Sequence, residues 1–335
     1  MRQRLAAVTL VLLCAGAFAA AESLNHPTGS TGLFLVDKLG GHVRFFDLSF
    51  KEQAAIQLGA NPHDFVLSAD HTLAYVPIYG DGVYGRNPNP GHEIAIIELA
   101  TRKVAGMIDV APYRAPHGIQ IDTDGTLYVA SDLDRKLLVI DPKTRSIKAA
   151  IDTDGTGHWI ALVPEARKVY VANKDDRPFV SVIDLRTQKM IGKVPAPNGT
   201  QGIAASPDGK TVVAIDMKEP VALVIDPATD TVRDRLPLGQ KGAGYKPYYS
   251  PDGSRLVIIS TSTTTAKIFD ATNLRAPFKD VQVGKAPMGV AFSKDGNTAL
   301  IANHGEGTVS AIDLRTSAVT TTFKAGTGIE TLTYY

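Results

Sequence analysis

The chain has 335 residues, of which 44% are hydrophobic and 21% are charged, with 30 glycines and 20 prolines. These proportions are typical of a globular protein and exclude a disordered, collagen-like or coiled-coil chain. The net charge of +1, with no block of basic residues, argues against a protein that captures nucleic acid or anionic membranes by electrostatic attraction.

The first segment has the pattern of a secretory signal peptide. Two arginines near the start precede an apolar run over residues 5–20, and small residues place a cleavage site near Ala19 or Ala21. An apolar run of this length is too short for a comfortable membrane span. We therefore expect residues 1–21 to be a signal peptide, and the mature protein to be periplasmic or secreted.

The remaining residues, 22–335, are predicted to form a single domain, because no second hydrophobic stretch or low-complexity linker interrupts them. The only cysteine, Cys14, lies inside the predicted signal peptide. The mature chain would therefore contain neither a disulfide nor a thiol nucleophile.

One short sequence pattern recurs along the mature chain: a few apolar residues followed by an acidic residue. The seven acids are Asp47, Glu98, Asp141, Asp184, Asp226, Asp270 and Asp313. Successive acids are separated by 51, 43, 43, 42, 44 and 43 residues, so the single long separation marks an insertion in the second unit.

Each unit repeats the same predicted elements in the same order. A start marked by Gly or Pro, as in residues 116–118, leads into a first strand, and a turn such as 206–209 follows it. A second strand such as 169–173 comes next, and then a loop and the strand that ends in the acid. A polar turn such as 185–187 precedes a last strand such as 190–194. No segment shows helical periodicity, so each unit is predicted to be a four-stranded antiparallel sheet.

Units of about 40–45 residues with four strands are blades of a β-propeller. Residues 33–37 resemble a second strand, and residues 329–335 resemble a first strand that lacks the rest of its blade. Pairing these two ends would close the ring and cover both sheet edges. We therefore predict an all-β, seven-bladed β-propeller with four antiparallel strands per blade, in which the C-terminal strand pairs with the N-terminal blade.

These repeats resemble the YVTN-repeat β-propeller family of exported bacterial type, over essentially all of the mature chain. The resemblance is carried by residues 116–119 (PHGI), 169–173 (VYVAN), 181–185 (SVIDL), 206–210 (SPDGK) and 300–303 (LIAN). It implies the fold more strongly than a function. Relatives include exported binding propellers, one of which binds DNA, and propeller subunits beside quinone cofactors. They also include the haem d1 domains of nitrite reductases, which usually have eight blades and longer chains.

A propeller directs one equivalent position of each blade onto its central channel. In this chain, the position at the start of each innermost strand is held by His63, His117, His158, Gln201, Lys246, Met288 and Glu330. The loops between the two middle strands add Tyr79, Asp81, Asp132, Asn173, Lys174, Asp216, Thr261, Asn303 and His304. We expect both sets on one face, and the Ser-Pro-Asp-Gly and Asp-Leu-Arg-Thr turns on the other. Because function generally lies in loops held by a rigid scaffold, the first face is the candidate site.

The histidines His63, His117 and His158 come from consecutive units and are predicted to converge on a metal ion. Neutral imidazoles suit copper, zinc or iron, and Met288 would add a softer ligand. The competing interpretation is structural, because Pro-His-Gly is a common turn in this repeat and such a histidine usually hydrogen-bonds the backbone.

A second set of residues is predicted to bind a small-molecule ligand or a protein partner. The insertion over residues 78–92 is interpreted either as a lid or partner contact or as a tolerated surface insertion. Lys246 departs from the Pro-x-Gly pattern. It is interpreted either as a cation that binds a substrate or as a simple divergence of one repeat. His304 is interpreted as a ligand or general base, or as a solvent-exposed loop residue. The full set is Tyr79, Asp81, Tyr84, Arg86, Asn173, Lys174, Lys246 and His304.

Other chemistries find no support in the sequence. Two Asp-x-Asp-Gly strings, at 122–125 and 152–155, lack the later Glu of a calcium-binding EF-hand loop. The first is interpreted as a turn, and a weak cation site at the second stays open. The chain contains no nucleophile elbow, phosphate-binding loop, dinucleotide fingerprint or haem attachment motif.

Three functions remain open on the sequence alone. An exported binding or scaffold propeller is favoured over an enzyme, because no residue pair forms a self-sufficient catalytic set. The alternative is a metal-dependent oxidase, lyase or lactone hydrolase that uses the histidines. Single-stranded DNA binding follows only from the resemblance, and the mature charge of about −1, after loss of two arginines, opposes it. We expect a monomer, since a closed propeller needs no second subunit to cover an edge.

Overall fold

The computed structural model describes residues 30–83, 86–174, 177–240, 242 and 244–335, so the predicted signal peptide and its cleavage site lie outside the described residues. The described part consists of strands and turns without a helix. Accordingly, it contains no helix that could cross a membrane.

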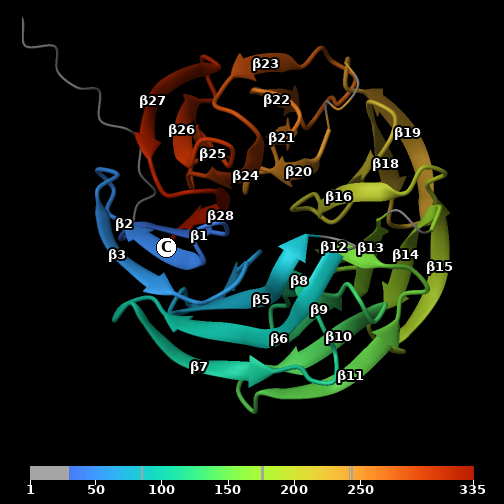
Figure 1. The fold of residues 1–335 in the computed structure, drawn as a ribbon. Helices are drawn as coiled ribbons and strands as arrows, with labels where there is room; N and C mark the ends of the chain where they lie inside the picture. Colours follow the sequence, from blue (N-terminus) through green and yellow to red (C-terminus); the bar gives the residue numbers. More distant parts are fainter. Residues whose placement is uncertain (1–29, 84–85, 175–176, 241, 243) are drawn as a thin grey trace, which may run out of the picture.

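The described residues form seven four-stranded antiparallel sheets arranged as blades in a ring about a central axis (Figure 1). Blade 1 is β28 (Ile329–Tyr334), β1 (Leu33–Asp37), β2 (His42–Phe46) and β3 (Glu52–Gln57); blade 2 is β4 (Val66–Leu67), β5 (Leu73–Val83), β6 (Arg86–Glu98) and β7 (Lys103–Asp109). Blade 3 is β8 (Pro116–Ile121), β9 (Leu127–Ser131), β10 (Lys136–Asp141) and β11 (Ser146–Asp152); blade 4 is β12 (Gly157–Val163), β13 (Lys168–Asn173), β14 (Phe179–Asp184) and β15 (Lys189–Pro195). Blade 5 is β16 (Thr200–Ala205), β17 (Val212–Asp216), β18 (Val221–Asp226) and β19 (Thr231–Pro237); blade 6 is β20 (Lys246–Tyr249), β21 (Arg255–Ile259), β22 (Thr265–Asp270) and β23 (Lys279–Gln282). Blade 7 is β24 (Pro287–Phe292), β25 (Thr298–Asn303), β26 (Thr308–Asp313) and β27 (Ala318–Lys324). The predicted fold class is confirmed.

The hydrophobic core lies between neighbouring blades. The middle strands are covered on both faces, so β9 and β14 are buried along their whole length and their sequences are nearly continuous apolar runs. The outermost strand β15 instead alternates exposed and partly buried residues, as is typical of a strand at the outer edge of a blade. The apolar run before each acid is therefore the signature of a strand buried between two blades.

Closure of the ring is carried by the two ends of the chain. Strand β28 pairs antiparallel with β1, from Leu33 opposite Tyr334 to Asp37 opposite Ile329. The buried Asp37 carboxylate accepts the backbone N–H groups of Thr327 and Gly328 and the Nε–H of Arg44. The predicted pairing of the C-terminal strand with the N-terminal blade is thus confirmed.

The acids that end the third strands shape the turns that follow them. Asp141, Asp226 and Asp313 each accept a hydrogen bond from the backbone N–H two residues later, at 2.9, 2.9 and 2.8 Å. This arrangement stabilises a tight reversal of the chain. The string at 122–125 is also a turn, since Gly125 N–H donates to the carbonyl of Asp122.

Glycines set the distance between innermost strands. A Cβ atom on Gly118 would lie 2.5 Å from the carbonyl oxygen of His158 in the next blade. The same position in other blades holds Gly202 and Gly289, where a Cβ would lie 2.4 and 2.3 Å from the carbonyl oxygens of Tyr245 and Glu330. The glycine of Pro-His-Gly therefore permits two innermost strands to approach closely at the channel.

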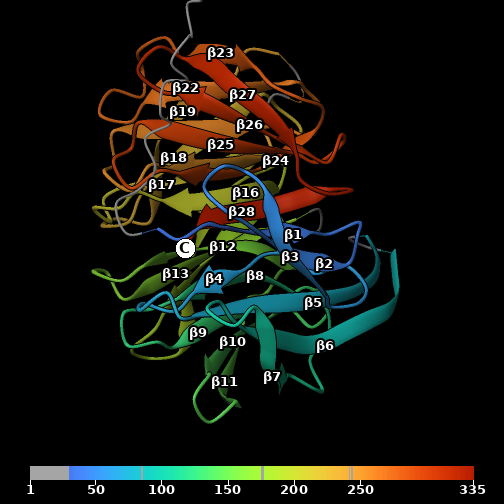
Figure 2. The same cartoon turned by 90° about the vertical axis from the view of Figure 1, so that its left-hand side faces the viewer.

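The insertion in the second unit extends a hairpin rather than forming an irregular loop. Strands β5 and β6 continue to pair beyond the blade, with Gly80 opposite Pro90 and Asp81 opposite Asn89. Figure 2 shows this hairpin projecting past the neighbouring blades. It rises from the face that also carries the loops leading into the innermost strands, because Tyr79 N–H donates to the carbonyl of Asn61.

The loops divide between two faces as predicted. On the first, the loops between the middle strands bond to the loops leading into the innermost strands, as in Lys174 N–H to the Thr156 carbonyl. On the second, which we call the turn face, Leu185 N–H donates to the Arg167 carbonyl.

Candidate metal centre

Four consecutive blades contribute an acid and three histidines to one arc of the channel. Glu330 lies on β28, His63 precedes β4, His117 lies on β8 and His158 lies on β12. The exposed fractions of these residues are 1%, 4%, 1% and 4%. We call these four residues the histidine cluster.

The rings of the cluster are packed directly against one another. The ring centroids of His63 and His117 are 4.2 Å apart, and those of His117 and His158 are 3.7 Å apart. Two groups could each hold a metal ion, with one ligand atom per residue and all three atoms within 4.8 Å of one another. The first is His63, His117 and Glu330, and the second is His117, Asp132 and His158, so His117 belongs to both.

The hydrogen bond of His117 fixes its tautomer. Its Nδ1 lies 3.1 Å from the backbone carbonyl oxygen of His158, which accepts only from an N–H. The lone pair of the neutral ring is therefore on Nε2, which is buried and has no hydrogen-bond partner among the described residues. A buried acceptor without a partner is unfavourable, and a metal-ligating histidine characteristically bonds the backbone through its other nitrogen.

His158 is held in a similar way by a carboxylate. Its Nδ1 lies 3.0 Å from Oδ2 of Asp132, which comes from the loop between β9 and β10. Both residues are buried. A carboxylate in this position orients an imidazole and raises its basicity as a ligand.

Glu330 makes two short contacts with nitrogen atoms. Its Oε1 lies 2.8 Å from Nδ1 of His63 and its Oε2 lies 3.0 Å from Nζ of Lys38, but neither contact is well aligned for a hydrogen bond. The Glu330 carboxylate and the His63 imidazole are close enough to share one ion, whereas the Lys38 ammonium has no lone pair and contributes only its charge.

Burial controls the charges of the cluster. It lowers the pKa of His63 to about 4 and holds the pKa values of His117 and His158 well below 6.5. Burial also raises the pKa of Asp132 well above its usual value. For Glu330, burial acts to raise the pKa, but interaction with the nearby His63 ring and with the Lys38 ammonium outweighs burial and holds the pKa well below 4.5. At neutral pH the three imidazoles are thus neutral, as metal ligands must be.

An aromatic and charged layer lies next to the cluster along the channel. The ring of Trp159 packs edge-on against that of His117, with centroids 4.6 Å apart. The Nζ atom of Lys246 lies 3.2 Å from the centroid of the Trp159 ring and 3.7 Å from Oδ2 of Asp64. Lys246 therefore faces the channel, as its position in the repeat predicts.

Two residues of the predicted ligand-binding set are buried in the structure. Tyr79 is fully buried, and its ring lies edge-on to those of His63 and His117 at 4.8 and 5.6 Å. Asn173 is also fully buried, and its Nδ2 donates to the Phe179 carbonyl and to Ser181 Oγ, both at 2.9 Å. Tyr79 therefore packs beside the cluster and Asn173 forms hydrogen bonds within its own blade, while their role in ligand or partner binding stays a prediction.

The other predicted residues are dispersed. Asp81 is exposed on the β5–β6 hairpin, where its Oδ2 accepts from Asn89. Tyr84 lies outside the described residues, and Arg86 begins β6 without a described side chain.

Two further residues of the set lie near the channel. Lys174 is half-buried, and its charge acts on the pKa values of all three histidines of the cluster. His304 is also half-buried rather than solvent-exposed, and burial lowers its pKa. Met288 is 8% exposed and is the second residue of β24, the position that His117 has in β8.

Glu330 and Asp132 have channel positions in the repeat, but the sequence pattern does not predict them as metal ligands. Glu330 reaches His63 only after ring closure joins the last strand to the first blade. Asp132 reaches His158 across a blade boundary. The available signal is their place in the repeat, since Glu330 aligns with the histidines.

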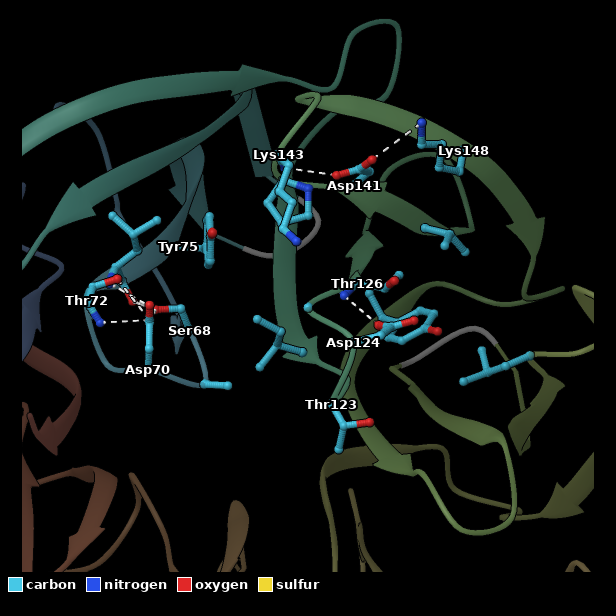
Figure 3. A pocket seen from close by; sticks show the side chains of 18 of the residues that line it. Ser68, Asp70, Thr72, Tyr75, Thr123, Asp124, Thr126, Asp141, Lys143 and Lys148 are labelled. Atoms are coloured by element: carbon cyan, nitrogen blue, oxygen red, sulfur yellow. Dashed lines mark hydrogen bonds and ion pairs between the residues drawn. The ribbon is translucent and has the colours of Figure 1, made fainter.

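A cavity of about 750 Å³ lies instead on the turn face beside blades 2 to 4 (Figure 3). Its polar groups are engaged with one another: Asp70 accepts from Ser68 and Thr72, and Asp124 accepts from the N–H of Thr126. These are turn-forming contacts, so this cavity presents no convergent set of unused polar groups.

Comparison with known proteins supports the fold. No protein-family profile matches the chain, and no curated protein matches it in sequence. The structure is similar to a chain of Kuenenia stuttgartiensis hydrazine synthase, with 18% identity, a TM-score of 0.73, and coverage of 88% of this chain and 98% of that one. It is also similar to the dihydro-haem d1 dehydrogenase NirN in complex with DHE, with 16% identity, a TM-score of 0.64, and coverage of 88% and 63%. At these identities the likeness establishes the propeller fold, while membership of the YVTN-repeat family stays a prediction.

Proposed function

We propose that this protein is an exported binding propeller that holds a transition-metal ion, copper, zinc or iron, in its central channel. The ion would lie at Nε2 of His117, with His63 and Glu330 on one side and His158, oriented by Asp132, on the other. The observation that carries this proposal is the buried, unpartnered Nε2 of His117 between two other imidazoles. Nitrogen ligands with a carboxylate suit these three metals.

A bare ion fits the cluster better than a metal in a macrocycle. The neighbour NirN is described in complex with DHE, which raises a haem-like occupant for comparison. An axial imidazole must present its nitrogen to open space above a planar ring. Here the rings of His117 and His158 stack at 3.7 Å, and all three histidines are at least 96% covered by protein.

Binding is favoured over catalysis for the same reason. A catalytic metal keeps an open coordination position for water or substrate, whereas a structural or stored ion is enclosed by protein ligands. The near-complete burial of the cluster supports an enclosed ion. An oxidase, lyase or lactone hydrolase would require groups that cover the cluster, such as Tyr79, to move away from it.

The proposal has two further parts. A partner protein docks on the same face, and the protein is exported as a periplasmic or secreted monomer. Both rest on the sequence pattern, since the signal segment lies outside the described residues. Single-stranded DNA binding gains no support, because the channel arc carries an acid beside its histidines rather than a basic groove.

The test is the metal content of the mature protein and of two matched variants. His117→Ala removes the central ligand, whereas His92→Ala removes the exposed histidine of another His–Asp pair, in which Nδ1 lies 3.0 Å from Asp109. After incubation with copper, zinc or ferrous iron and removal of excess metal, wild type and His92→Ala should retain a stoichiometric ion and His117→Ala should not. Wild type without metal, or His117→Ala with as much metal as wild type, would refute the proposal.

A further inference from the structure

A second cavity occupies the channel beyond the histidine cluster. Its volume is about 500 Å³, within the range of small-molecule pockets. Its walls are mainly apolar and come from the innermost strands of several blades, including Phe65, Ile121, Ile160, Ile203 and Leu332. Residues near the turn face, such as Pro207, also line it, so it lies between that face and the cluster.

Opposite charges stand side by side in this apolar cavity. Lys246 and Asp64 both line it and are 8% and 5% exposed. Their closest charged atoms, Nζ and Oδ2, are 3.7 Å apart, which is longer than a hydrogen bond. The lysine is otherwise held by the faces of Trp159 and Tyr248, at 3.2 and 5.0 Å from the ring centroids.

A third polar group in the cavity wall is poorly satisfied. Trp159 is 3% exposed, and its indole Nε1–H makes no well-aligned hydrogen bond among the described residues, although the side chain of Tyr245 interacts with it. An indole N–H is a donor only, and burying it without a well-placed acceptor is unfavourable. The protein alone thus leaves a weakly paired donor beside an ion pair that is too long for a hydrogen bond.

We propose that this cavity binds a small zwitterion of the amino-acid class. The ligand carboxylate would accept from Lys246 Nζ and Trp159 Nε1, its ammonium would donate to Asp64, and an apolar side chain would lie along the strand walls. An α-amino acid carries both charges on neighbouring atoms, so it can meet a lysine and an aspartate this close together. A simple anion would face the Asp64 carboxylate, and a simple cation would face Lys246.

The inference is independent of the proposed metal, because none of these contacts uses a histidine of the cluster. Trp159 is the only tryptophan of the chain, so tryptophan fluorescence, excited selectively over the 11 tyrosines, reports on the surroundings of this one side chain. Metal-free mature protein would be titrated with the common L-amino acids, followed by fluorescence and calorimetry. At least one apolar amino acid, such as leucine, should bind saturably and change the emission.

Two analogues separate the charges. For leucine, 4-methylpentanoate lacks the ammonium and 3-methylbutylamine lacks the carboxylate, and each should bind about tenfold or more weakly because one charged pair is lost. Failure of every amino acid to bind would overturn the proposal. Equal binding of leucine and 4-methylpentanoate would also overturn it, since the cavity would then recognise an anion.

Variants identify the groups. Lys246→Met should weaken leucine binding about tenfold or more, while Asp64→Asn should weaken leucine but not 4-methylpentanoate. Lys218→Met, at an exposed position, is the matched control and should bind leucine as wild type does. If Lys246→Met fails to fold, Asp64→Asn and the analogue series decide the matter. Unchanged leucine affinity in Asp64→Asn would contradict the assignment.

Discussion

Substitution of Asp37 by asparagine tests how the ring is closed. Asp37 is fully buried, and its oxygens accept the N–H of Gly328 at 2.8 Å, the N–H of Thr327 at 3.1 Å and the Nε–H of Arg44 at 2.9 Å. Two of these donors lie about 290 residues away in the chain, just before the last strand. The carboxylate therefore joins the two ends of the protein.

The expected loss follows from these contacts. Hydrogen bonds to a charged group contribute roughly 1.5–3 kcal/mol each to the free energy of unfolding. Asparagine keeps one acceptor oxygen but turns an NH₂ group towards the remaining donors, so at least one charge-assisted bond is lost and another weakened. Asp37→Asn should reduce the free energy of unfolding by about 2–4 kcal/mol, a large share of the roughly 5–15 kcal/mol typical of a native protein.

The effect should depend on pH. Burial raises the pKa of Asp37, but the N–H groups of Gly328 and Thr327, together with Arg44, outweigh it and hold the pKa below 3.8. Because the folded-state pKa is below the unfolded value, this stabilisation is present above pH 3.8 and is lost as pH falls through the folded pKa. The difference between wild type and Asp37→Asn should therefore be largest near neutral pH and shrink in acid.

Urea denaturation followed by circular dichroism measures the difference, with Asp47→Asn as the control. Asp47 accepts N–H groups from Ser49 and Lys51 in its own turn, at 2.9 and 3.0 Å, where water can replace it. Asp37→Asn should lower the unfolding midpoint clearly more than Asp47→Asn does. Equal midpoints for the two variants would show that Asp37 does not hold the ring closed.

Three further predictions concern how substitutions near the histidine cluster, and the metal itself, change stability and metal binding. Gly118→Ala and Gly202→Ala should destabilise the protein to a similar extent, because the new Cβ atoms would lie 2.5 and 2.4 Å from carbonyl oxygens. Only Gly118→Ala should weaken metal binding, as measured by a competition titration. Asp132→Asn should weaken metal affinity roughly 10–100-fold by releasing His158, whereas Asp109→Asn, beside the exposed His92, should not. Metal at a free concentration about a hundredfold above its Kd should raise the free energy of unfolding by about 2.7 kcal/mol. For a chain of this length, calorimetry should show this as a rise in Tm of roughly 4 °C. The Tm of His117→Ala should not change when metal is added.

Repetition makes the fold predictable. The acid at the end of each third strand recurs at a spacing set by one blade, and it recurs because it forms the same turn each time. The same repeat places His63, His117 and His158 at or just before the start of neighbouring innermost strands, and the rings do lie in contact. Their common location follows from local pattern and symmetry alone.

The remaining features depend on contacts between units, which a repeat does not encode. Tyr79 and Asn173 lie on the second strands β5 and β13 rather than in loops, yet Tyr79 packs against the histidines and Asn173 forms hydrogen bonds within its own blade. The glycine-flanked loop around His304 suggests an exposed residue, but neighbouring groups half-bury it. The pairing of Asp132 with His158 crosses a blade boundary, so no spacing within one unit could predict it.

Ring closure and the candidate metal centre depend on the same strand. Glu330 is the second residue of β28, and Asp37 holds the backbone of Thr327 and Gly328 directly before that strand. If the Asp37 contact is lost, the start of β28 is free to shift, and Oε1 of Glu330 no longer stays 2.8 Å from Nδ1 of His63. Asp37→Asn should therefore weaken metal binding although it lies outside the ligand set, while Asp47→Asn should leave it intact. Destabilisation of Asp37→Asn with unchanged metal affinity would remove Glu330 from the site and leave the histidines as its ligands.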